Sequence, residues 1–487
     1  MSFLQRILWP FSPRKLVAPP SGVDTVPCTG LDLIPLDVVL TSGFIVDARL
    51  DAKKLEETLS TLIVHRLPRA GARLALRNGV YEFQVPKMFD AETPPVVFTV
   101  EDYAEPYRCA TRPELPIHLP DSFDATQPFV CPEPRLEVYL RSKDCPATLE
   151  AFLVPNMPSL HVHVAVFDDL TFIGVTASHV CADVLGTQTL LHAWTRLLNG
   201  DALDSIPGMA RDAAPFAAFR GPTAAAQPRG WYDLGWFSRF LFIVRLVIRV
   251  LPDPKEAAYI IRVPKTFLAD AKRDMMRQLE LQGSSEWVGS SDVLLAWWFK
   301  TAYGHRKLTD TTPIHIHMPV NLRGKPVFPN AEVLPIPYLH YAVLDVAVPP
   351  IPAHALRTES LGALALRLRR AINDYTADPA RMAADMHWRC AHPLKVLFPC
   401  PPHAEFFVQT SWRAAHYGAL DFSGAAVEAN AKARVVFCTG VTSSRMNIPY
   451  RGFGVVLMED EDAVWMGQVR GTKDWEDIRR NGVVEFI

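Results

Sequence analysis

The stretch SLHVHVAVFDDLTFIGVTASHVCADVLGTQTLLHAWTRLLNG, residues 159–200, contains the clearest structural pattern of the chain. Its first arm alternates apolar and polar residues until Asp168-Asp169, and an apolar second arm ends at His179, which predicts a β-hairpin. The residues after the hairpin predict a helix that begins near Gly186-Thr187 and ends at Asn199-Gly200. A hairpin followed directly by a helix favours a mixed α/β fold.

The short connection between hairpin and helix reads His179-Val-Cys-Ala-Asp183, an HxxxD motif. With 15 histidines in the chain, about one His-x-x-x-Asp match is expected by chance, so the place of the motif between strand and helix is more informative than the match itself. A neutral imidazole at the end of a strand can accept a proton, and an aspartate four residues later can turn inward to fix the loop. From this motif alone, both a structural role and a general-base role of His179 remain open. Cys181, inside the motif, is expected to be a buried thiol rather than a nucleophile.

The segments before the hairpin repeat the mixed pattern. Residues 31–50 predict strand structure, and residues 51–69 predict a helix with Asp51 as its N-cap. Asn78-Gly79 between two alternating arms predicts a second hairpin. The second half of the chain predicts strands at 259–265 and 314–320, with helices at 265–282 and 291–303 between them.

The middle of the chain separates these two halves. Residues 200–230 are rich in Ala, Pro and Gly, which is typical of a linker. The apolar segment that follows has arginines at 239, 245 and 249, and predicts a buried or lobe-bridging helix, with a membrane-surface helix at 236–251 as the alternative. The 487 residues exceed what one core usually supports. We therefore expect an irregular lead-in at residues 1–30 and a lobe with the HxxxD motif at 31–220. A linker with a connecting helix at 221–256 and a second lobe at 257–487 follow.

Composition excludes several functions. Lys and Arg number 50 against 52 Asp and Glu, so the chain has no general attraction for nucleic acid. The eight cysteines form no CxxC pair, and the alternating histidine pairs at 161/163 and 315/317 lack partners in register, so no metal is expected. The absence of a signal-peptide pattern and of a long apolar run predicts a cytoplasmic protein. The sequence also lacks GxSxG, P-loop, HExxH and GxGxxG motifs, which gives no support to the corresponding hydrolases and nucleotide-binding enzymes.

The HxxxD stretch resembles the central motif of the BAHD acyltransferases, CoA-dependent enzymes that acylate hydroxyls or amines of secondary metabolites. Further segments resemble that family in the same order, over about residues 30 to 480, and look more like its fungal branch: LSTLIVHRLPRAGARL (59–74), SSDVLLAWWFKTAY (290–303), MPVNLRGKPVFPNAEVLPIPYLHYA (318–342) and TSWRAAHYGALDFSGA (410–425). The sequence departs from the family at three places. Val184 replaces the glycine after the motif, and Gly186 is expected to supply the turn instead. His340-Tyr341 replaces a Gly-Asn pair. The DFGWG motif is only partly present, with Asp421, Phe422 and Gly424 as its remaining residues, which have a structural role in the family.

The resemblance implies an α/β fold of two chloramphenicol-acetyltransferase-like domains, each a mixed β-sheet flanked by helices, with the active-site channel at their interface. It implies that His179 is the general base and that Asp183 pairs with Arg323 to support the catalytic loop. An acyl-CoA, expected to be acetyl-CoA, is the co-substrate, and no tightly bound cofactor or metal is needed. The acceptor would be a hydroxyl or amine of a small metabolite. The resemblance also implies a monomer, and membrane association is not expected except through 236–251.

Two further groups of residues are candidates for binding. Thr410, Ser411 and Trp412 are candidates for stabilising the oxyanion or binding substrate, with plain strand packing as the alternative. Ser290 and Ser291 resemble positions near the pantetheine arm of CoA, with a helix N-cap as the alternative.

Two other functions remain open. A condensation-type enzyme usually has a doubled histidine in the motif, whereas position 178 here is Ser. A catalytically silent homologue that binds a ligand or a protein is compatible with the altered motifs.

Overall fold

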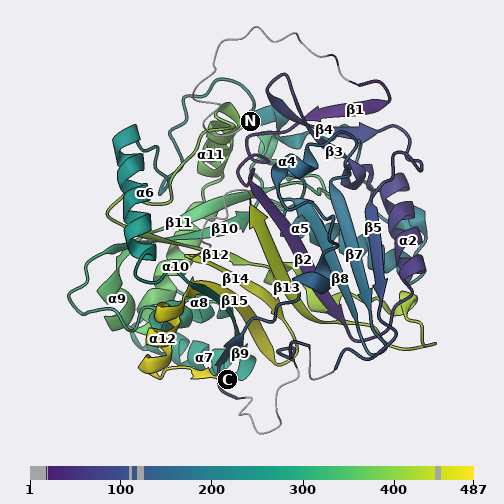
Figure 1. The fold of residues 1–487 in the computed structure, drawn as a ribbon. Helices are drawn as coiled ribbons and strands as arrows, with labels where there is room; N and C mark the ends of the chain where they lie inside the picture. The colour runs from purple at the N-terminus through teal and green to yellow at the C-terminus, as the bar shows by residue number, and fades with distance from the viewer. Residues whose placement is uncertain (1–17, 19, 109–111, 118–125, 445–450) are drawn as a thin grey trace.

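The computed structural model describes residues 18, 20–108, 112–117, 126–444 and 451–487, and their strands form three sheets with helices packed on them (Figure 1). The smallest sheet is antiparallel and has the order β1-β4-β3, with strands at Val23–Pro27, Val80–Pro86 and Arg73–Arg77. Asn78 and Gly79 turn between β3 and β4 with φ angles of 53° and 81°, so the predicted hairpin is confirmed.

The five-stranded sheet has the order β13-β2-β8-β7-β5 and includes the hairpin of the HxxxD stretch. Leu160 of β7 lies opposite Ala177 of β8, which confirms that hairpin. Every residue of β7 is buried, so its alternating histidines do not face solvent. The strands have these bounds: β2 Val38–Val46, β5 Val97–Asp102, β7 Leu160–Val166, β8 Thr171–Ser178 and β13 Val435–Ser444.

Two helices pack together beside this sheet. Helix α2 spans Ala52–His65, and the Asp51 carboxylate caps it by accepting from the Lys54 amide at 3.1 Å, as predicted. Helix α5 spans Val184–Leu198 and begins two residues before the predicted start, because the Asp183 side chain caps it. The indole of Trp194 in α5 donates to the Thr58 hydroxyl of α2 at 3.0 Å.

The eight-stranded sheet is mixed and has the order β11-β10-β12-β14-β15-β9-β6-β16. Helix α8, Ser290–Ala302, is almost entirely buried beside it. The strands have these bounds: β6 Phe129–Pro132, β9 Glu256–Pro264, β10 Pro313–Asn321, β11 Val343–Pro352, β12 Glu405–Ser411, β14 Phe453–Glu459, β15 Ala463–Gly471 and β16 Glu485–Phe486. The other helices are α7 Lys265–Leu281, α9 Ala353–Thr358, α10 Leu361–Thr376, α11 Pro379–Ala391 and α12 Thr472–Asn481.

Short helical turns occupy several connections. They are α3 Glu137–Leu140, α4 Leu149–Phe152, and the 3₁₀ turns η1 Pro68–Gly71, η2 Leu203–Ser205, η3 Pro215–Phe219, η4 Pro329–Ala331, η5 Arg413–Ala415, η6 Tyr417–Ala419 and η7 Ser423–Ala425. The connection predicted as a linker is packed rather than free, since Phe216 and Phe219 of η3 are buried against Phe328.

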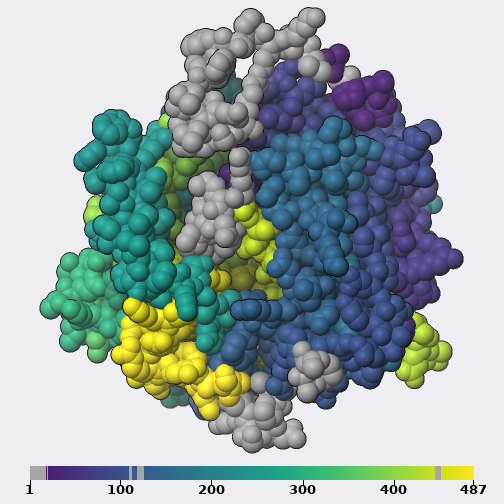
Figure 2. Space-filling model, viewed as in Figure 1, coloured from purple at the N-terminus to yellow at the C-terminus, as the bar shows by residue number. Residues whose placement is uncertain are grey.

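The two larger sheets exchange one strand each. Strand β13, from the end of the chain, pairs antiparallel with β2 of the first half, and β6, from the first half, pairs antiparallel with β9 of the second. One apolar core runs through both sheets. Figure 2 shows a hollow between the purple-to-blue first half and the teal-to-yellow second half. The exchange fixes the two halves against each other, and the sheets do not divide strictly at the predicted linker.

Helix α6 spans Trp236–Val250 and lies at one edge of the molecule (Figure 1). Of the predicted buried or lobe-bridging helix, the burial is wrong, because none of its residues is buried and Trp236 is 82% exposed. Its inner side packs on the second half of the chain, where the Phe242 ring lies 5.0 Å from that of Phe398. In the part of the chain that the structure describes, no helix is long and apolar enough to cross a membrane.

Candidate active site

The HxxxD motif forms a tight loop where three strands meet. The His179 amide donates to the Val38 carbonyl at 2.8 Å, which fixes the end of β8 to the start of β2. Val38 is also paired with Ser444, the last residue of β13. His179 therefore lies where a strand of the second half joins the sheet of the first half.

The His179 ring is held in one orientation. Its Nδ1 lies 2.8 Å from the Ala182 carbonyl oxygen, which can only accept, so the proton is on Nδ1 and Nε2 keeps its lone pair. The Tyr341 ring packs edge-on at 5.5 Å, and Nε2 has no hydrogen-bond partner among the described residues. Burial lowers the pKa of His179 below 6.5, against smaller opposing effects of the Ala182 bond and the Asp183 charge. The ring is thus neutral at pH 7 and able to accept a proton at Nε2.

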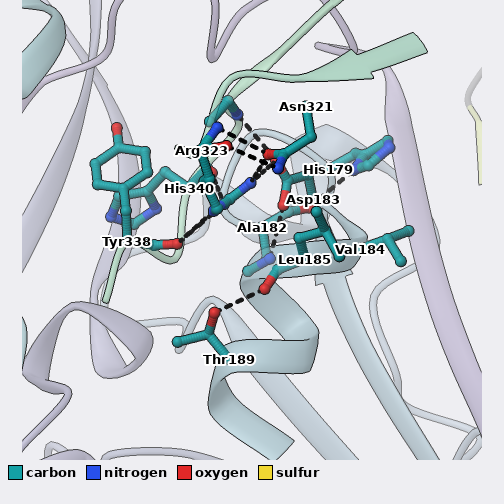
Figure 3. Close-up of polar contacts among 12 residues, drawn as sticks. His179, Ala182, Asp183, Val184, Leu185, Thr189, Asn321, Arg323, Tyr338 and His340 are labelled. Atoms are coloured by element: carbon teal, nitrogen blue, oxygen red, sulfur yellow. Dashed lines mark hydrogen bonds and ion pairs between the residues drawn. The ribbon is translucent and has the colours of Figure 1, made fainter. Parts of the chain in front are cut away.

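Asp183 points away from that ring and toward Arg323 (Figure 3). Its Oδ2 accepts from Arg323 Nη1 at 2.8 Å and from the Ala342 amide at 2.9 Å, while Oδ1 accepts from the Gly186 amide at 2.7 Å. Both members of the ion pair are buried. The structure thus contains the expected Asp183–Arg323 contact, and the carboxylate holds the loop without touching the imidazole.

Arg323 uses its remaining donors on the segment that faces the loop. Nε and Nη2 donate to the Tyr338 carbonyl at 3.2 and 2.9 Å, and Nη2 also donates to the His340 carbonyl at 2.9 Å. Nη1 reaches the Asn321 side-chain oxygen at 3.1 Å. A single guanidinium therefore joins residues 338–340 to the start of α5.

His340 and Arg69 support the same loop, and neither was identified from the sequence. His340 Nε2 accepts from Arg69 Nε at 2.9 Å, so Nδ1 has the proton and donates to the Cys181 carbonyl at 2.7 Å. Burial and the Arg69 charge hold the pKa of His340 well below 6.5, which keeps this arrangement. In the sequence, His340-Tyr341 was noted only because it replaces the Gly-Asn pair of the family. The signal that could have placed His340 near the loop is that it lies in the same stretch, residues 318–342, as Arg323.

Gly186 allows the close packing of α5 on this segment. A Cβ at this position would lie 1.8 Å from the Leu339 carbonyl oxygen. The expectation that Gly186 supplies a turn is wrong, because the residue lies within the first turn of α5 and serves this contact instead.

Gly186→Ala is therefore expected to push the Leu339 backbone away and to lower the free energy of unfolding by about 1–3 kcal/mol or more. Urea unfolding followed by tryptophan fluorescence measures this. Gly362→Ala is the matched control, since Gly362 also lies in the first turn of a helix, α10, and its added methyl would meet only Met275 Cγ at 3.7 Å. Equal stability of the two variants would contradict the role of Gly186.

The candidate binding residues of the second half lie close to one another. Arg413 Nη1 donates to the Ser291 hydroxyl at 2.8 Å and to Ser290 at 3.3 Å, and Arg413 directly follows Thr410, Ser411 and Trp412. Trp412 is buried against Gly440 of β13, whereas Ser411 is exposed. Among the described residues, no hydrogen bond joins these side chains to the HxxxD loop.

The alternative that Ser290 or Ser291 caps α8 is wrong. The N-cap is Gly289, whose amide donates to the Asp292 carboxylate at 2.6 Å. The two hydroxyls are thus engaged by Arg413 instead of by the helix end.

The remnant of the DFGWG motif lies at the other end of α5. Asn199 donates to the Asp421 carbonyl at 2.8 Å and accepts from the Gly424 amide at 2.9 Å, and Phe422 packs edge-on against Trp194. Glycine is required at 424 because a Cβ would lie 2.0 Å from the Leu198 carbonyl oxygen. Helix α5 separates this contact from Asp183 by about 22 Å.

Among the described residues, other reactive side chains give no alternative centre. Burial raises the pKa of Cys181 to about 12, so its thiolate is not available near neutral pH. Burial also lowers the pKa values of His161 and His315 to about 4. Within the described ranges, no group of three or more His, Cys, Asp or Glu side chains could hold a metal ion.

A model of the Transferase family matches residues 148–427, more than half of the chain. The chain belongs to this family, the BAHD-type acyltransferases. Membership confirms the expected class of enzyme, a CoA-dependent acyltransferase with acyl-CoA as co-substrate.

Curated relatives and solved structures agree with this assignment. Acetyltransferase adrJ of Penicillium rubens is 27% identical over 406 residues, covering 81% of this chain and 80% of the relative. The crystal structure of F. sporotrichioides TRI101 complexed with coenzyme A and T-2 aligns with a TM-score of 0.63 at 14% identity, covering 94% of this chain and 97% of that one. Vinorine synthase aligns with a TM-score of 0.57 at 14% identity, covering 96% of both chains. The predicted two-domain fold of this transferase is thereby confirmed.

Proposed function

We propose that this transferase moves an acetyl group from acetyl-CoA to a hydroxyl or amine of a small secondary metabolite, with His179 as the general base. The observation on which this rests is the His179 ring, whose Nδ1 is bound to the Ala182 carbonyl and whose Nε2 keeps a free lone pair. The relative adrJ is named an acetyltransferase, and the TRI101 structure contains coenzyme A and the small molecule T-2, which supports this substrate class.

In the proposed reaction, Nε2 of His179 accepts the proton of the acceptor as its oxygen or nitrogen attacks the thioester carbonyl. The tetrahedral intermediate then collapses, the carbon–sulfur bond breaks, and the CoA sulfur takes the proton back from the imidazolium. General-base assistance of this kind contributes about 10²–10⁴-fold to the rate. Holding both substrates together contributes much of the remainder.

Asp183 and Arg323 act in this proposal as positioning residues. They hold the loop through the Ala342 and Gly186 amides and leave the imidazole free. The proton moves only between the acceptor, Nε2 and the CoA sulfur.

The second half is proposed to bind CoA and the oxyanion. Thr410 and Ser411 end β12, and Trp412, directly after it, packs against Gly440 of β13. A donor there that reaches the oxyanion would be worth about 2.7–4 kcal/mol. Ser290 and Ser291, oriented by Arg413, are proposed to contact the pantetheine arm.

The test is incubation with acetyl-CoA, a thiol reagent and a panel of alcohols and amines, followed by mass spectrometry of the products. CoA release together with an acetylated acceptor is the expected result. Binding of acetyl-CoA with no CoA release for any acceptor would contradict the proposal and favour a catalytically silent homologue.

The pH dependence follows from the lowered pKa of His179. Only the neutral ring can accept a proton, so activity is lost as the pH falls through that pKa, which lies below 6.5. We expect kcat/KM to be constant from neutral pH down past 6.5 and to fall only at more acid values. A profile for an alcohol acceptor, with protein stability measured at each pH as the control, would contradict this if its acid limb lay above 6.5.

A further inference from the structure

The solvent-facing side of α6 is apolar over its whole length. Trp236, at its start, is 82% exposed, and Leu251, directly after its end, is 69% exposed. The exposed apolar residues of this stretch are Trp236, Phe237, Phe240, Leu241, Ile243, Val247, Ile248 and Leu251. We call this set the α6 apolar face. A continuous exposed patch of this kind marks an interaction surface.

The position of each residue around the helix explains why the face is continuous. At about 100° per residue, the α6 apolar face covers an arc of about 160°, from Ile243 to Leu241. Arg239 and Arg245 lie about 40° outside the two borders of this arc. Helix α6 thus has a broad apolar side edged by cations, and its sequence contains no Asp or Glu.

The inner side of α6 is attached to the protein, so this face cannot turn inward. Phe242 packs on Phe398, and the Arg249 guanidinium pairs with Glu405 at 3.0 Å. Arg239 donates to the Leu234 carbonyl at 2.6 Å and pairs with Asp233 at 3.2 Å. The Phe242 and Arg249 contacts reach residues far from α6 in the chain and fix the rotation of the helix. Figure 2 shows α6 in teal at one edge of the molecule.

We propose that α6 binds the surface of an anionic lipid bilayer, with its apolar face inserted at the level of the headgroups. Aromatic and branched apolar side chains on one side and arginines at the borders are the pattern of an interfacial helix. Arginine side chains at the borders can extend to lipid phosphates, and Arg245, which is exposed, has no ion-pair partner among the described residues.

The charge and the width of the face favour a bilayer over a second copy of the chain. Two copies joined through this face would bring two copies of the exposed Arg245, which has no ion-pair partner among the described residues, together without carboxylates from α6. An arc of about 160° is also wider than the narrow seam that two paired helices bury. An anionic surface matches both properties.

The test is co-sedimentation of the full chain with vesicles of phosphatidylcholine containing about one third phosphatidylserine. Phe240→Asp/Val247→Asp changes two exposed residues at the centre of the face, so it leaves the fold intact and is expected to reduce the partition coefficient by at least about tenfold. Val138→Asp/Leu281→Asp, which changes two exposed apolar residues outside α6, is the matched control and is expected to bind like the unmodified protein.

Charge provides the second measurement. Arg245→Glu is expected to weaken binding to the anionic vesicles by roughly tenfold and to change binding to pure phosphatidylcholine little. Acyl transfer to a water-soluble acceptor without vesicles should be unchanged in all these variants, so a failure here is distinguishable from a failure of the proposed function.

Three results would overturn the proposal. They are the absence of vesicle binding by the unmodified protein, equal binding by the Phe240→Asp/Val247→Asp variant, and sedimentation velocity that shows a dimer which this variant converts to a monomer. The last result would assign the face to a second copy.

Discussion

His179→Ala is expected to lower kcat for acetyl transfer by about 10²–10⁴-fold. The variant removes Nε2, the only atom of the loop to which we assign proton acceptance, and the nearby carboxylate cannot replace it because Asp183 is engaged by Arg323, Ala342 and Gly186. The release of CoA under saturating substrates measures the effect. KM for acetyl-CoA is expected to change much less than kcat, since the ring acts on the acceptor proton.

Two controls keep this result interpretable. His403→Ala removes an exposed histidine of the second half and is expected to retain full activity. The stability of His179→Ala should fall by about 1–3 kcal/mol, because one hydrogen bond to a carbonyl and the packing of the ring against Tyr341 are lost. A folded His179→Ala protein with an unchanged rate would remove His179 from the mechanism and would favour a direct attack by an already deprotonated acceptor.

Asp183→Ala is expected to have the largest effect on stability, a loss of about 3–5 kcal/mol, together with nearly complete loss of activity. The substitution leaves the buried Arg323 guanidinium without its carboxylate and leaves the Ala342 and Gly186 amides without their acceptor. The loop that positions His179 then loses its attachment to the second half of the chain. Urea unfolding and CoA release measure the two losses.

Asp51→Ala separates helix capping from the ion pair. Asp51 caps α2 as Asp183 caps α5, with its carboxylate 3.1 Å from the Lys54 amide, so its removal is expected to cost about 0.5–2 kcal/mol. The double variant Asp183→Ala/Arg323→Ala should be less destabilised than the two single variants together, because the unpaired charge is gone. A loss for Asp183→Ala no larger than that for Asp51→Ala would show that the ion pair contributes little.

Local patterns predicted most of the elements near the site. Three of these patterns depend only on neighbouring residues, and all three are present in the structure. They are the alternating arms around Asp168-Asp169, the Asn78-Gly79 turn and the Asp51 cap. The start of α5 was predicted two residues late because the Asp183 side chain serves both the helix cap and the ion pair.

The remaining differences depend on residues far apart in the chain. His340 and Arg69 are separated by 271 positions, and their hydrogen bond is created only when the two halves pack. For α6 the sequence left a buried or lobe-bridging helix and a membrane-surface helix open for a related reason, since an apolar segment does not show what covers it. The exchange of β6 and β13 likewise follows from tertiary pairing, and no local pattern marks it.

That exchange determines how the molecule can come apart. Removing the second half would leave β2 with an open edge, and removing the first would take β6 from between β9 and β16. Each fragment would then expose a row of unpaired backbone N–H and C=O groups, so we expect either fragment, when expressed alone, to aggregate. The native chain should therefore melt in one cooperative transition, and the HxxxD loop, which lies where the two halves meet, should keep its structure until the whole chain unfolds.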